Sequence, residues 1–132
     1  MTGDDAMHEF QTVWLPNIAD AGLRRLSDLL QSSSPLLIHG AFTRAIPMGC
    51  LASHVAWNHP DTEHQNEEAG ACWLTKIAGL NPATSAVILA WDRGGLHDRQ
   101  LRGEIHAACR AELDRRAEWL EEHVEELCAS VA

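Results

Sequence analysis

Cysteine and histidine side chains occur in pairs at helical spacing in two parts of the chain. Cys50 and His54 are four residues apart, and His106 and Cys109 are three apart, so on helices each pair would share one face. Thiolate and imidazole groups together suit zinc or another divalent transition metal, and zinc is typically held by four such ligands in a tetrahedron. If the two helices face each other, these side chains would form a metal site with two cysteine and two histidine ligands.

Three further side chains could contribute to this metal site. His59 follows the first pair, His64 comes five residues later, and Glu68 lies four residues after His64, where a helix would place the two together. Steps of five residues do not stay on one helical face, so we rank these three side chains below the two pairs. Free cysteine is often buried as a small apolar residue, and core packing is therefore the alternative interpretation of the thiols.

Cys50 is also a candidate nucleophile. Helices tolerate proline in their first turn, so Pro47 predicts a helix over residues 47–57 with Cys50 near its start. The amide groups and the dipole at a helix start lower the pKa of a thiol, and His54, one turn later, could act as a base. This arrangement resembles that of the thiol hydrolases, in which a cysteine at a helix start is paired with a histidine. The resemblance implies a cysteine-dependent enzyme centred on Cys50 and His54.

A third pattern lies in the middle of the chain. Gly79 stands between two predicted helices and is followed by the apolar Leu80 and by Ala83-Thr84-Ser85 at the start of the second helix. Residues 73–91 are therefore similar to the helix-turn-helix of bacterial transcription regulators, which implies DNA binding. The second helix, however, offers no arginine, lysine, asparagine or glutamine to a base edge and is apolar nearly all round. We expect this helix in the core and rank DNA binding last.

The composition restricts the partners of the chain. Its 132 residues carry 10 Lys and Arg against 19 Asp and Glu, which leaves a net charge of −9. Nucleic-acid-binding proteins need a basic surface to neutralise phosphates, so we expect no nucleic-acid partner. Residues 1–10 lack the basic start and apolar centre of a secretory signal, and no apolar run approaches the roughly 18 residues of a membrane span. We therefore expect a cytoplasmic protein without a membrane segment.

The spacing of apolar and helix-breaking residues predicts an all-α fold. We expect one compact domain over residues 1–132, a bundle of about five helices after an irregular segment over residues 1–16. Thr62 with Gln65 matches a capping box, and Asn81 with Pro82 matches a helix start. The predicted helices cover residues 17–31, 47–57, 62–79, 82–92 and 98–130.

The last predicted helix is too long for a globule of this size. Residues 98–130 would span roughly 50 Å as a helix, whereas a compact domain of this length is roughly 36 Å across. The helix must therefore kink, with Gly103 as the weak point, or project beyond the body. Its apolar residues repeat at steps of four and three, as in a coiled coil: Leu113, Ala117, Leu120, Val124, Leu127 and Val131.

This apolar stripe has two interpretations. It could pack on the protein's own bundle, which is the usual fate of an amphipathic helix. It could instead form the interface of a homodimer, in which Arg115 or Arg116 of an antiparallel copy would offset the glutamates near the helix end.

The function expected from these patterns is that of a small acidic helical protein acting as a non-catalytic interaction or regulatory module. Self-association through residues 113–131 and binding of another protein are the two candidate modes. The alternative is a small enzyme centred on Cys50 and His54, dependent on a zinc-like metal or on the thiol itself. A weaker alternative is a helix-turn-helix regulator.

Overall fold

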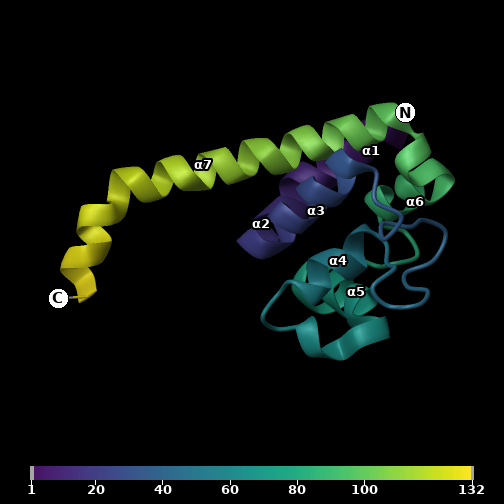
Figure 1. Ribbon diagram of the computed structural model, residues 1–132, viewed down its shortest axis with the longest axis horizontal. Coiled ribbons are helices and arrows are strands. Elements are labelled where there is room, and N and C mark those ends of the chain that lie inside the picture. Colours follow the sequence, from purple (N-terminus) through teal and green to yellow (C-terminus); the bar gives the residue numbers. More distant parts are fainter. Residues whose placement is uncertain (1, 132) are drawn as a thin grey trace.

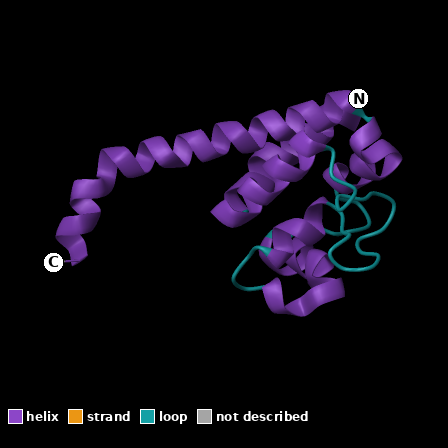
Figure 2. Ribbon diagram, in the orientation of Figure 1, coloured by secondary structure: helices purple, strands orange, loops and turns teal. Residues whose placement is uncertain are grey.

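The computed structural model describes residues 2–131, and the regular elements among them are all helical (Figure 2). The predicted all-α fold with a long C-terminal helix is therefore confirmed. In chain order the elements are α1 (Thr2–Glu9), the π-helical turn η1 (Phe10–Trp14), α2 (Leu15–Asn17), α3 (Asp20–Ser32), α4 (Leu51–Trp57), the 3-10 segment η2 (Glu63–Glu68), α5 (Ala69–Cys72), the π-helical turn η3 (Trp73–Ile77), α6 (Ala86–Gly94), the 3-10 turn η4 (Gly95–His97) and α7 (Arg99–Val131).

One apolar core lies between α1, α3, α4, α6 and the first half of α7 (Figure 1). α3 packs along α7, α4 packs against α3 and α5, and α1 packs against α6. Trp14 and Trp73 are fully buried, with ring centroids 5.0 Å apart, and Phe10 lies 5.7 Å from Trp14. These rings belong to η1 and η3, so aromatic packing ties the N-terminal segment to the middle of the chain.

The N-terminal segment is helical, so the prediction that residues 1–16 are irregular is wrong over the described part. α1 continues without interruption through η1 into α2, and Met1 lies outside the described residues. Ala6, Phe10 and Trp14 recur every four residues and are fully buried. This spacing is the signal of a helix with one apolar face, and the acidic residues at the start of the chain obscured it.

Two arginines of α7 hold α3 at its two ends. At the end of α3, Arg102 donates from Nε to the carbonyl of Leu30 (2.8 Å), and at its start Arg116 pairs with the Asp20 carboxylate (2.7 Å). α3 therefore runs antiparallel to α7. Leu30 lies in the last turn of α3, where its carbonyl accepts only a long bond from the Ser33 amide (3.5 Å), and the guanidinium of Arg102 supplies a second, shorter one.

The helix that contains His54 begins later than predicted. α4 starts at Leu51, and Pro47 lies in the preceding loop after a cis peptide bond. The amides of Gly49 and Cys50 donate to the carbonyls of Leu36 and Phe42, so the backbone here pairs across the loop. A Cβ atom on Gly49 would lie 2.6 Å from the ring of Trp57, and this close approach explains the glycine.

The predicted helix over residues 62–79 is broken into three pieces, η2, α5 and η3. Asn66 interrupts the first piece with a backbone conformation of φ 53° and ψ −116°. The predicted capping box is wrong, because the Thr62 hydroxyl donates to the Ala56 carbonyl at 2.8 Å and makes no cap bond; the Gln65 side chain lies outside the described residues. Gly79, with φ 70°, follows the last turn as predicted.

The start of α6 depends on a carboxylate from α1, which is distant in the sequence but packs against α6. The predicted start at Asn81 is wrong, because Asn81 caps only a turn by accepting from the Ala83 amide (2.8 Å). The Glu9 carboxylate instead accepts from the Ser85 hydroxyl (2.5 Å) and from the amides of Ala86 (2.9 Å) and Val87 (3.0 Å). Glu9 thereby satisfies amides that have no partner within the helix, at the end where the dipole favours negative charge.

We predict that Glu9→Gln lowers the free energy of unfolding by about 1–3 kcal/mol, because an amide replaces one acceptor oxygen with a donor that faces other donors. Urea unfolding of the full chain measures the change. Asp5→Asn is the matched control, because Asp5 lies exposed on the same helix. Equal stability of the two variants would contradict this role of Glu9.

Candidate functional site

Cys50 does not lie inside the first turn of a helix. It precedes α4 in an extended conformation (φ −77°, ψ −177°), and its side chain is buried, 3.9 Å from the Ser53 hydroxyl oxygen. Burial raises the pKa of the Cys50 thiol above its ordinary value. The predicted activation of this thiol by a helix start is therefore wrong.

His54 is a buried structural side chain. Only 1% of it is exposed, and its Nε2 lies 2.8 Å from the Leu36 carbonyl oxygen, which accepts the ring N–H. Trp57 packs edge-on against the ring, with centroids 5.1 Å apart. Burial lowers the pKa of His54, and the positive charge of Arg25 acts in the same direction. The imidazole is thus held neutral and bonded to the loop, and no bond joins it to Cys50.

The other predicted metal ligands do not gather around the first pair. Cys109 is fully buried, and burial raises the pKa of its thiol to about 12. Nε2 of His106 is buried without a hydrogen-bond partner among the described residues. His59 accepts from the amide of Asp61 (3.2 Å), and His64 and Glu68 are exposed on η2.

Within residues 2–131, no three His, Cys, Asp or Glu side chains lie close enough together to hold a metal ion. The predicted site built from Cys50, His54, His106 and Cys109 is therefore not assembled.

The helix assigned to DNA recognition lies in the core, as expected from its composition. α6 begins at Ala86, and its Val87, Ile88 and Trp91 side chains are buried. The indole of Trp91 donates to the Ile38 carbonyl at 2.9 Å, which fixes the helix against the loop before α4. Of the residues that carried the resemblance at the start of this helix, Ala83 and Thr84 are exposed in the turn before α6, and Ser85 is its N-cap.

α7 runs past the body and leaves apolar side chains exposed. It contains 33 residues, about 50 Å of helix along its axis, and it continues through Gly103. Figure 1 shows its second half extending away from the other elements and bending sharply near its C-terminal end. The side chains that α7 buries in the body, Leu101, Ile105 and Cys109, all belong to its first half.

The second half of α7 carries the predicted apolar stripe. Leu113 is half-buried against the core, and Ala117 is exposed. Trp119, Leu120, Val124 and Leu127 are 46%, 49%, 51% and 43% exposed, and the side chain of Val131 lies outside the described residues. Packing on the protein's own bundle therefore accounts for Leu113 alone. Trp119, which the stripe did not include, stacks on His123 with centroids 4.2 Å apart.

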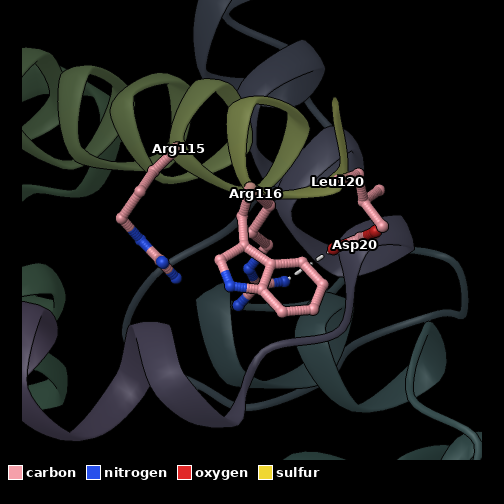
Figure 3. Close-up of a pocket in the computed structure, with 5 residues that line it drawn as sticks. Asp20, Arg115, Arg116 and Leu120 are labelled. Atoms are coloured by element: carbon pink, nitrogen blue, oxygen red, sulfur yellow. Dashed lines mark hydrogen bonds and ion pairs between the residues drawn. The ribbon is translucent and has the colours of Figure 1, made fainter. Parts of the chain in front are cut away.

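The arginines at the base of this projection are paired within the chain. Arg116 pairs with Asp20 at 2.7 Å (Figure 3). Arg116 also pairs with Glu112 at 2.7 Å, and Arg115 donates twice to Glu112, at 2.9 and 2.7 Å. The hydrogen bond from Arg115, followed by that from Arg116, holds the pKa of Glu112 below its ordinary value. With Leu120 and Trp119, both arginines and Asp20 line a pocket of about 380 Å³.

No family model, curated protein sequence or solved structure matches this chain. No helix among the described residues is long and apolar enough to cross a membrane. The case for a function therefore depends on the arrangement of the side chains alone.

We predict that an alkylating reagent at pH 6–7 modifies the exposed Cys128 and leaves Cys50 and Cys109 unmodified, because burial and a raised pKa withhold both the thiol and the thiolate. Mass spectrometry of the labelled peptides shows which cysteines react first. Labelling in urea is the control, since all four thiols should then react. Faster labelling of Cys50 than of Cys128 at pH 6 would contradict the buried, inactive thiol.

We predict that the protein loses stability as the pH falls below about 6.5 and that His54→Gln removes part of this loss. The unfolded chain protonates its histidines near pH 6.5, whereas the lowered pKa of His54 keeps the folded side chain neutral until the pH is lower. The contribution of the neutral His54 to stability is therefore fully present above about pH 6.5 and declines as the pH falls below it. Urea unfolding at pH 7.5 and 5.5 measures how much the free energy of unfolding changes with pH. His64→Gln is the control, because His64 is exposed. An unchanged dependence on pH in His54→Gln would contradict the assignment.

Proposed function

We propose that this chain is a non-catalytic protein-interaction module and that the projecting half of α7 is its binding surface. The exposed row of Leu120, Val124 and Leu127 on the part of α7 beyond the body is the observation that carries the proposal. Burying a large apolar side chain completely is worth about 1.5–3 kcal/mol. Three half-exposed side chains on one helix can therefore supply a few kcal/mol to a complex.

The shape of this surface suits the docking of another helical segment. Apolar residues that recur at steps of three and four form one narrow strip along a helix, and such strips bind in grooves or against a second helix. Glutamates occupy much of the remaining surface, and no lysine or arginine follows Arg116. Charge of one sign around an apolar strip favours partners of complementary charge and reduces unspecific aggregation.

The state of the buried thiol and imidazole groups also supports a non-catalytic function. Cys50 has its pKa raised by burial, and His54 is bonded to a carbonyl, so neither group is prepared for nucleophilic attack or proton transfer.

A photo-crosslinking residue placed on α7 tests the proposal. We predict that a photoreactive phenylalanine analogue at position 124 forms crosslinked products in the cells that make the protein, because Val124 lies on the exposed apolar row. The same analogue at position 122 is the matched control, since two residues turn the helix by about 200° and place Glu122 on the opposite side. Mass spectrometry identifies what is attached.

Two outcomes of this experiment are informative. Products that depend on position 124, whatever their mass, support the binding surface. Equal products from both positions, or none from either while the variants remain folded, would overturn the proposed function.

A further inference from the structure

A second strip on α7 stays open to solvent along nearly the whole helix. Its members follow one another at steps of three or four residues, the spacing of one helical face, and all of them are exposed. We call this strip the open face of α7. It consists of Arg99, Gly103, Ala107, Arg110, Asp114, Ala117, Glu121, Val124 and Cys128.

The open face changes its charge from one end to the other. Its first half carries Arg99, Arg110 and, near the middle of the helix, Asp114, whereas its second half carries Glu121 and lies beside further glutamates. Arg110 and Glu121 are eleven residues apart, about three turns, so both lie on the same side of the helix. Unlike Arg115 and Arg116, neither forms an ion pair with another of the residues 2–131.

We propose that the partner of α7 is a second copy of this chain, lying antiparallel so that Arg110 faces the partner's Glu121. A two-fold axis between Arg115 and Arg116 then forms this pair twice, because both copies present the same face. A parallel copy would place Arg110 beside the partner's Arg110 and Glu121 beside the partner's Glu121. Charge complementarity therefore selects the antiparallel arrangement. This inference rests on the proposed function of α7.

The same register also pairs the partner's exposed Leu127 with a pocket at the start of α7. A pocket of about 330 Å³ lies between the end of α3 and the start of α7, lined by Leu30, Gln31, Arg99, Arg102, Gly103 and His106. Counted along the chain, the antiparallel register pairs the partner's Leu127 with Glu104, next to Gly103 at the edge of this pocket. Leu127 is 43% exposed in the single chain, whereas Leu30 is fully buried, so a side chain entering the pocket would contact the other residues that line it.

Small residues permit the two helices to approach closely at this place. A Cβ atom on Gly103 would have no heavy atom of another element within 4 Å, so the surface there is unobstructed. Ala107 lies one turn further along the open face, opposite the partner's Val124 in the same register. The body of each copy lies against Leu101, Ile105 and Cys109, which occupy a different side of α7 and do not obstruct the open face.

A basic helix of a different protein would match only some of these features. It could neutralise the glutamates of the second half of α7, but it would leave Arg110 and the pocket beside Gly103 without a counterpart. A second copy supplies a glutamate for Arg110 and a leucine for the pocket at once.

Exchange of the two charges tests the register by sedimentation equilibrium of the full chain. We expect the native chain to dimerise, and Arg110→Glu and Glu121→Arg each to weaken the dimer by about tenfold or more, because each creates two like-charge pairs. The double variant, and an equimolar mixture of the two single variants, should recover the native affinity, because opposite charges then face each other again. Glu122→Arg, which is exposed but lies about 100° around the helix from Glu121, is the matched control and should leave the dimer unchanged.

Thermal unfolding establishes that the variants are folded, which is expected because every changed side chain is exposed. A native chain that stays monomeric at all concentrations would overturn the second copy as partner. The proposed function would still stand if position 124 then crosslinked to a different protein, and both would fail if it crosslinked to nothing. A dimer that is insensitive to both single changes would overturn the antiparallel register.

Discussion

The antiparallel packing of α3 on α7 determines the shape of the whole molecule. Arg102 bonds the carbonyl at the end of α3, and Arg116 bonds the carboxylate at its start, so the length of α3 defines how much of α7 belongs to the body. Beyond Arg116, no further element among the described residues covers α7, and the apolar side chains of Trp119, Leu120, Val124 and Leu127 remain exposed. The binding surface that we propose is thus a consequence of two helices of unequal length.

The body achieves its stability with polar groups that act far from their own place in the sequence. The Glu9 carboxylate caps α6 across a separation of more than seventy residues, and the indoles of Trp73 and Trp91 donate to the carbonyls of Asn17 and Ile38. A buried indole N–H or helix amide without a partner would cost free energy, so each of these bonds restricts how the elements can pack. The histidine and cysteine side chains that suggested chemistry belong to the same class of structural contacts.

Several local features of the fold could be predicted because short-range physics decides them. Proline and glycine are frequent near helix ends, and the helix ends predicted at residues 57, 79 and 92 lie within two residues of the ends in the structure, although Gly22 and Gly103 lie inside α3 and α7. The helix over Arg99–Val131 begins after Asp98, whose carboxylate accepts from the Leu101 amide at 3.1 Å, a cap that the residue types themselves favour. The start of α4 could not be predicted, because the amides of Gly49 and Cys50 bond carbonyls of the loop that begins at Leu36.

By itself, the sequence determined the all-α class, the C-terminal ends of most predicted helices and the excess length of the last helix, because periodicity, helix-breaking residues and chain length are local or additive properties. Only the tertiary structure decided which side of α7 is covered, because that depends on where α3 ends and on which arginines it engages. The same holds for Cys50 and His54. Their spacing is compatible with a chemical site. Burial, however, raises the pKa of Cys50 and lowers that of His54, and the ring N–H of His54 donates to the Leu36 carbonyl. Burial is a property of the assembled core, and the spacing of two residues in a chain does not contain it.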